Sequence, residues 1–118
     1  MSSLSTLKAR IEASSRIRVL NDNFRSTFLG GRVVMTAGVA ELPIDTKAQV
    51  LLRVQKFSSF NGKNDPHREH DFGSFTLAGQ KYFWKIDYYD LQCQFGSEDP
   101  SDPEKTTRVL TIMLAEEY

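Results

Sequence analysis

The stretch FGSFTLAGQKYFWKIDYYD, residues 72–90, decides the fold. Two alternating apolar and polar segments, 72–77 and 81–90, flank Gly79, which supplies the positive φ of a tight turn, so this pattern predicts a β-hairpin. Side chains two positions apart share a face of a strand. One face of the second segment is expected in the core and carries Tyr82, Trp84, Ile86 and Tyr88. The opposite face carries Phe83, Lys85, Asp87 and Tyr89.

Two helices are expected before this hairpin. The first has an apolar face built from Ile17, Leu20, Phe24 and Phe28, at spacings of three and four residues, and Gly30-Gly31 ends it. Leu4, Leu7 and Ile11 form an earlier stripe, which Ser14-Ser15 separates from the first. Residues 1–15 are therefore expected either to continue the helix with a bend or to form a loosely attached helical segment. The second helix starts at Leu42-Pro43 and stops near residues 58–59.

Further strands are expected at residues 32–36 and 106–114. The order of helix, strand, helix and three strands predicts the α+β class. We expect a single two-layer domain over residues 1–118, in which an antiparallel sheet of about four strands carries two helices on one face. The predicted core contains Phe24, Phe28, Leu51, Val54, Trp84, Ile86, Leu110 and Ile112. The open face of the sheet would carry Ser74, Thr76, Lys85, Asp87, Thr107 and Thr111.

The composition argues against several classes of protein. Of the 118 residues 40% are hydrophobic, which excludes a disordered chain, and fifteen basic residues balance fifteen acidic ones. A net charge of zero gives no long-range attraction to nucleic acid or to an anionic membrane, so neither is expected as a partner. The lone Cys93 forms no disulfide within the chain, and no run approaches the roughly 18 apolar residues of a membrane span. A cytoplasmic location is expected.

The segment NDPHREHDF, residues 64–72, concentrates polar side chains in a stretch that Asn64 and Pro66 mark as a loop. Imidazole and carboxylate groups suit zinc, iron or manganese, and the ligands would be His67, His70 and Asp71. Asx-turn hydrogen bonding explains the same segment without a metal. We therefore expect no metal and no cofactor.

A second candidate for chemistry lies on the aromatic strand. The carboxylate of Asp87 would serve as an acid or a base if the loop folded His70 back onto it. Lys85 shares the face of Asp87, and an ion pair between them would neutralise the carboxylate instead, as is common on sheet surfaces. The catalytic candidates are therefore His67, His70 and Asp87, with the ion pair as the favoured alternative for Asp87.

Four segments resemble a small bacterial family of unknown function: GGRVVMTAGV (30–39), NDPHREHDFG (64–73), WKIDYYD (84–90) and TRVLTIMLAEEY (107–118). The resemblance covers about residues 16–118, and its motifs are NDPHxEHDFG and WKIDYYD, with Arg68 where the family has glycine. That family is frequent in alphaproteobacteria and often plasmid-borne, and it has no established activity. Plasmid carriage implies an accessory or anti-defence role.

The favoured hypothesis is an accessory or inhibitory factor that binds another protein and is associated with mobile elements. Arg68 would anchor that partner, since arginine pairs bidentately with carboxylates. The full set of candidate binding residues is Arg68, Glu69, Asp71, Phe83, Lys85 and Tyr89. The alternative is a small metal-dependent or acid–base enzyme using the His67, His70 and Asp71 loop. A nucleic-acid-binding module comes third, supported only by the basic first helix.

Overall fold

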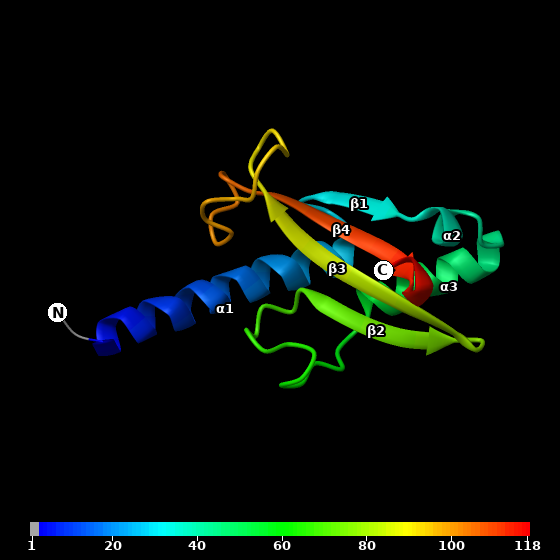
Figure 1. Cartoon of the computed structure of the whole chain (residues 1–118), viewed down its shortest axis with the longest axis horizontal. Coiled ribbons are helices and arrows are strands. Elements are labelled where there is room, and N and C mark those ends of the chain that lie inside the picture. Colours follow the sequence, from blue (N-terminus) through cyan, green and yellow to red (C-terminus); the bar gives the residue numbers. More distant parts are fainter. Residues whose placement is uncertain (1–2) are drawn as a thin grey trace.

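The computed structural model describes residues 3–118. Two longer helices, one short helix and a four-stranded sheet build it, with a short 3-10 helix, η1, at the end (Figure 1). In chain order the elements are α1 (Ser3–Thr27), β1 (Arg32–Met35), α2 (Ala37–Ala40), α3 (Ile44–Gln55), β2 (Phe72–Leu77), β3 (Gln80–Tyr89), β4 (Thr107–Leu114) and η1 (Ala115–Glu117).

The predicted hairpin is confirmed. β2 and β3 pair antiparallel, and Leu77 faces Gln80 across a turn of two residues. Both turn residues have positive φ, 51° at Ala78 and 80° at Gly79. This is the turn geometry whose twist matches that of the paired strands, which is why glycine is favoured there. The alternation along β3 is also as expected, because Tyr82, Trp84 and Ile86 are buried.

The predicted α+β class and the four strands are confirmed, and the sheet is mostly antiparallel. Its strand order is β1-β4-β3-β2, and β4 pairs antiparallel with β3. An antiparallel sheet was predicted, and one edge departs from it, since β1 pairs parallel with β4. Parallel neighbours need a long connection along the chain. Here the chain forms α2, α3, β2 and β3 after β1 and before β4. The alternation within β1 carries no information about its direction.

Both longer helices cover the same face of the sheet, as predicted (Figure 1). α1 runs without a break through Ser14 and Ser15, so the two apolar stripes belong to one helix. Residues 37–40, expected only to lead out of the first strand, form the short helix α2. α3 begins one residue after Pro43 and ends at Gln55, close to the predicted bounds. Among the described residues, no helix is long and apolar enough to cross a membrane.

The core lies between the helices and the sheet. Six of the eight predicted members are buried in it, and Phe28 and Leu51 are partly buried at its edge; the six are Phe24, Val54, Trp84, Ile86, Leu110 and Ile112. Trp84 is fully buried and lies over Gly73 on the neighbouring strand. A Cβ at Gly73 would stand 2.5 Å from the indole nitrogen of Trp84, so only glycine allows this approach. Gly73, the last residue of the NDPHREHDFG motif, therefore allows Trp84 to pack against β2.

The face of the sheet away from the helices is open, as predicted. Lys85 and Asp87 lie on it and form an ion pair of 3.0 Å, which confirms the ion-pair interpretation of Asp87. Phe72 and Phe83 contact each other there with ring centroids 5.3 Å apart, and Tyr118 packs edge-on against both rings. The face of the sheet that the helices leave uncovered therefore combines aromatic and charged side chains.

Candidate functional site

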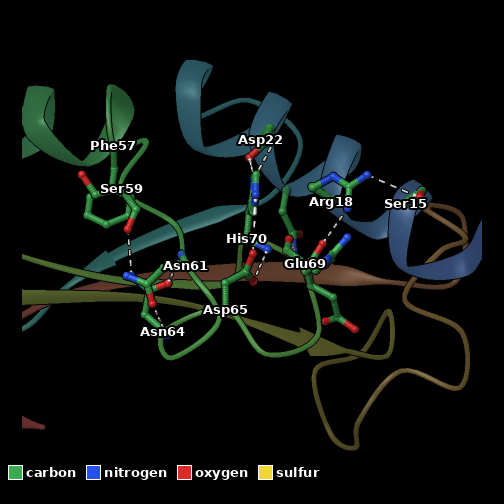
Figure 2. A network of polar contacts seen from close by, with 12 residues as sticks. Ser15, Arg18, Asp22, Phe57, Ser59, Asn61, Asn64, Asp65, Glu69 and His70 are labelled. Atoms are coloured by element: carbon green, nitrogen blue, oxygen red, sulfur yellow. Dashed lines mark hydrogen bonds and ion pairs between the residues drawn. The ribbon is translucent and has the colours of Figure 1, made fainter. Parts of the chain in front are cut away.

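The loop between α3 and β2 is stiffened by its own asparagines (Figure 2). Asn61 Oδ1 accepts hydrogen bonds from the backbone N–H groups of Lys63 at 2.8 Å and Asn64 at 3.1 Å. Asn64 Oδ1 in turn accepts from the Asn61 N–H at 2.8 Å, and its amide donates to the Ser59 carbonyl at 2.9 Å. These are the side-chain-to-backbone bonds of Asx turns, so the turn chemistry expected for this loop is present.

Asp65 closes the second half of the loop. Its side chain is buried, and its Oδ1 accepts the backbone N–H of His70 at 3.0 Å. Its carbonyl accepts the backbone N–H of Arg68 at 3.2 Å. Arg68 and His70 both have left-handed backbones, with φ of 56° and 54°. Glycine adopts this conformation readily and arginine rarely, so the position where the resembled family has glycine is one where this chain accepts backbone strain.

The imidazole of His70 joins the loop to α1. Its Nδ1 donates to Asp22, 2.9 Å from Oδ1 and 3.1 Å from Oδ2, and its Nε2 lies 3.5 Å from Asp65 Oδ2. The ring stacks on Phe60, with centroids 3.7 Å apart and planes 3° from parallel. Each ring nitrogen therefore faces a carboxylate, and one face is covered by an aromatic ring. The arrangement fixes the loop and leaves neither nitrogen turned to an incoming ligand.

A second polar network lies beside the first, centred on the buried Asn21. Its amide donates to the Tyr88 hydroxyl at 2.8 Å and to the Glu69 carbonyl at 3.0 Å. Its Oδ1 accepts from Arg108 Nε at 2.8 Å. The Tyr88 hydroxyl donates onward to Glu69 Oε1 at 2.8 Å. The network joins α1, the loop, β3 and β4. Within it, the Asn21 side chain has hydrogen-bond partners for both its amide nitrogen and its oxygen.

Burial sets the protonation states in this network. It raises the pKa of Tyr88 far above its usual value, so the phenol stays protonated and acts as a donor. It lowers the pKa of Arg108, which nonetheless remains a cation. Burial, followed by the nearby Glu69 carboxylate, also raises the pKa of Asp71. Tyr88 thus donates to Glu69 of the loop, and Arg108 donates to Asn21 of α1.

A groove separates the loop from α1. One cavity of about 390 Å³ is lined by Arg10, Ile11, Ser14, Ser15, Arg18, Pro66, His67 and Arg68. A second cavity of about 420 Å³ is lined by Arg18, Phe60, Asn61, Gly62, Asp65, Arg68 and His70. Arg18 and Arg68 line both, and Arg18 Nη1 donates to the Arg68 carbonyl at 3.0 Å. We call these two cavities together the arginine groove.

The predicted site residues are not all brought together. Arg68 and His67 are exposed at the arginine groove, whereas Glu69 is turned inward to Tyr88 and Asp71 is half-buried. The side chains of Phe83, Lys85 and Tyr89 lie on the open face of the sheet. The candidate binding residues therefore divide between two surfaces of the molecule.

The catalytic and metal candidates do not converge either. His70 pairs with Asp22 on α1, while Asp87 lies on the open face with Lys85, so the loop does not fold back onto Asp87. The hydrogen bond that Lys85 donates to Asp87, together with the negative charge of that carboxylate, raises the pKa of Lys85 and keeps it a cation. Within residues 3–118, no three His, Cys, Asp or Glu side chains are placed to hold a metal ion together. The geometry thus keeps His70 and Asp87 in separate places.

The side chains of α1 and β4 that hold this site were not among the residues predicted from the sequence; they are Asn21, Asp22, Arg25 and Arg108. A signal was present in α1, because positions 21 and 25 continue the buried spacing set by Ile17 and carry polar residues. Arg25 donates to the carbonyls of Val54 and Phe57 and to Asp22, and it lies over the Trp84 ring. A polar residue in an apolar stripe was the sign that a polar network lay opposite.

Comparison with known proteins places these elements in one family. The model of the family described as "Protein of unknown function (DUF3768)" matches residues 35–117, which covers α2, α3, the loop and strands β2 to β4. The helix α1 lies outside this match. Neither the curated proteins nor the solved structures contain a match to the chain. Since the family model covers well over half of the sequence, the chain belongs to the DUF3768 family of proteins of unknown function.

Proposed function

We propose that this protein acts by binding another protein, and that Arg68 anchors the partner in the arginine groove. The observation that carries the proposal is that Arg18 and Arg68 both line this groove, between a helix and a loop that is already fixed. Arginine is enriched among the residues that dominate binding energy, because its planar fork pairs with carboxylates.

The rigidity of the loop supports this function. The Asn61 and Asn64 turns, the Asp65 bonds and the His70–Asp22 contact hold residues 61–70 before any partner arrives. A preformed loop loses little conformational entropy on binding, so more of the contact energy appears as affinity. The same contacts occupy the groups that an enzyme would need, which favours binding over acid–base or metal chemistry at this site.

The biological setting is part of the proposal. The motifs NDPHxEHDFG and WKIDYYD resemble those of alphaproteobacterial proteins that are often plasmid-borne. This resemblance supports an accessory or inhibitory factor of a mobile element that acts in the cytoplasm on a host protein. The mobile-element setting is supported by this resemblance, whereas the binding surface is supported by the positions of Arg18 and Arg68.

The test is site-directed crosslinking in host lysate. A photoreactive amino acid at position 67, which is exposed in the groove, should crosslink to one protein. Arg68→Ala should reduce the amount of that crosslinked product at least about tenfold, because the substitution removes a binding anchor. Arg68→Lys should bind with intermediate strength, because lysine keeps the charge and loses the fork. Arg68→Ala should leave the free energy of unfolding within about 0.5 kcal/mol of wild type.

The control places the same photoreactive amino acid at Thr76, which is exposed on the open face of the sheet. Crosslinking from position 76 to the same partner, unchanged by Arg68→Ala, would contradict the proposed surface.

A further inference from the structure

The N-terminal half of α1 extends beyond the rest of the molecule. Every residue from Ser3 to Glu12 is exposed, and the first buried residue of the helix is Ile17. Figure 1 shows this half of the helix projecting past the end of the sheet, with no other element beside it. A helical segment of this length is marginal in water by itself, because helix formation has a costly nucleus. Packing against a partner would stabilise it.

An apolar stripe runs along this exposed half and leads into the arginine groove. Leu7 and Ile11 are 52% and 58% exposed. At 3.6 residues per turn, Leu7, Ile11 and Arg18 fall on one side of the helix. Ile11 and Arg18 also line the groove, so the stripe and the groove form one continuous surface. From Leu7 to Arg18 this surface is about 17 Å long, at 1.5 Å per residue.

The charges along the apolar stripe and the first cavity of the groove have one sign, whereas the second cavity also holds Asp65, which is buried and faces His70. Lys8 and Arg10 flank the apolar stripe on its two sides, and helical geometry turns Glu12 away from it. The charged or titratable side chains that line the first cavity of the groove are Arg10, Arg18, His67 and Arg68, and there is no carboxylate among them. The surface is therefore an apolar strip bordered by basic groups, although the whole chain has a formal net charge of zero.

We propose that this surface binds an amphipathic helix of the partner protein, whose apolar residues are bordered by Asp and Glu. An apolar helix face fits between α1 and the Pro66–Arg68 segment, as in other helix-in-groove complexes, and its carboxylates meet Lys8, Arg10, Arg18 and Arg68. The inference rests on the proposed function and names the chemistry of the partner. It also gives α1, which lies outside the family match, a role in recognition.

Two other occupants fit the charges less well. A second copy of α1 would bring Lys8 and Arg10 against the same basic residues, and like charges beside a helical seam oppose pairing. An anionic membrane would attract the basic groups, but the Pro66–Arg68 segment stands beside the stripe as the second wall of a groove, whereas a membrane needs one open face.

The experiment uses the full chain and a designed probe. A fluorescent peptide of about 18 residues carries leucine at the a and d positions, glutamate at the e and g positions and alanine elsewhere. A second peptide has lysine in place of each glutamate. Fluorescence anisotropy should show that the acidic peptide binds at least about tenfold more tightly than the basic one. Raising the salt from about 50 mM to about 500 mM should weaken this binding, because the Debye length shortens.

Matched variants locate the surface. Leu7→Ser, Ile11→Ser and Arg10→Glu should each weaken binding of the acidic peptide at least about fivefold. Leu52→Ser changes a leucine of α3 that is 47% exposed, and Arg32→Glu changes an exposed arginine of β1, so both should bind like wild type. Circular dichroism checks that each variant keeps its fold.

Three results with the peptides or with vesicles would overturn the inference. They are equal affinity for the two peptides, binding of the acidic peptide that Leu7→Ser and Arg10→Glu leave unchanged, and binding of phosphatidylglycerol vesicles in place of the peptide. Sedimentation equilibrium that showed a dimer dissolved by Leu7→Ser would overturn it in favour of a second copy. If the peptide fails while position 67 still crosslinks to a protein in an Arg68-dependent way, the proposed function stands and only the helical, acidic partner is wrong.

Discussion

At the scale of single residues, the molecule uses its chemically versatile side chains as supports. His70 lies between the carboxylates of Asp22 and Asp65, and Tyr88 stays protonated between Asn21 and Glu69. Arg68, in contrast, has a strained backbone and an exposed side chain at the groove. Function is therefore expected from the exposed residue, and stability from the inward-facing ones.

Trp84 is the largest fully buried side chain, so its substitution tests the packing of the core. It is fully buried, and its ring lies beneath the guanidinium of Arg25. Trp84→Ala should lower the free energy of unfolding by about 3–5 kcal/mol, because a large cavity replaces the indole. Urea denaturation measures this loss. Phe95→Ala is the control, since Phe95 is 72% exposed and should change stability by less than about 0.5 kcal/mol. A loss below about 1 kcal/mol at Trp84 would contradict this packing.

Asp71 gives a test with a defined pH dependence. Its pKa is raised in the folded protein, first by burial and then by Glu69, so its ionised form lowers stability at neutral pH. Asp71→Asn should therefore raise the free energy of unfolding at pH 7. The gain should shrink as the pH falls through the folded pKa and vanish below the ordinary carboxyl value, where both states are protonated.

Thermal melts of wild type and Asp71→Asn across this pH range measure the effect. Asp99→Asn is a control of opposite sign, because hydrogen bonds from Ser101 lower the pKa of Asp99. Its loss of stability should be present at neutral pH and should disappear as the pH falls through the folded pKa of Asp99. A gain at Asp71 that is constant with pH would contradict the assigned cause.

At the scale of elements, α1 is held to the sheet by polar as well as apolar contacts. Phe24 enters the core, while Asn21 bridges to Tyr88 on β3 and to Arg108 on β4. Arg25 donates to two carbonyls at the end of α3. Buried polar groups are costly unless each has a partner, so this helix is fixed in one position along the sheet.

Asn21→Ala tests the docking of α1. The substitution removes the acceptor of Arg108 Nε and leaves a buried cation partly unpaired, so we expect a loss of about 2–3 kcal/mol. Asn23→Ala, two positions along the same helix and exposed, should cost less than about 0.5 kcal/mol. Chemical denaturation of both variants gives the comparison, and equal losses would show that the polar network adds no stability.

At the scale of the whole molecule, a firmly packed body carries an exposed helical arm. The described residues span 56 Å along the longest axis and 23 Å along the shortest, and the N-terminal half of α1 accounts for much of this elongation (Figure 1). Local opening is cheapest where few apolar contacts hold the chain. The arm and the body should therefore differ in stability.

Hydrogen exchange should reveal this difference. Amides of residues 3–12 should exchange close to the rate of an unfolded chain, and those of residues 17–27 should be protected by packing on the sheet. His70→Ala should speed exchange across residues 61–71 and leave β2 to β4 unchanged, because the loop loses its contact with Asp22. Protection of residues 3–12 equal to that of residues 17–27 in the free protein would show that the arm is stable without a partner.

The sequence by itself determined the local elements of this protein and their inward faces. The period of two along Tyr82, Trp84 and Ile86 and the turn at Gly79 specified the hairpin, because strand alternation and turn backbones depend on near neighbours. The class followed from the order of these elements. Sequence reasoning also located the loop and the exposed Arg68, whose role in binding remains a prediction.

Only the tertiary structure decided what these elements face. The parallel pairing of β1 with β4, the contact of His70 with Asp22 and that of Asn21 with Arg108 join residues far apart in the chain, the last two separated by 48 and 87 positions. A periodic pattern says which side of an element is inward, but it does not say which distant element lies opposite. That choice depends on the packing of the whole chain, in which a buried polar group without a partner is costly.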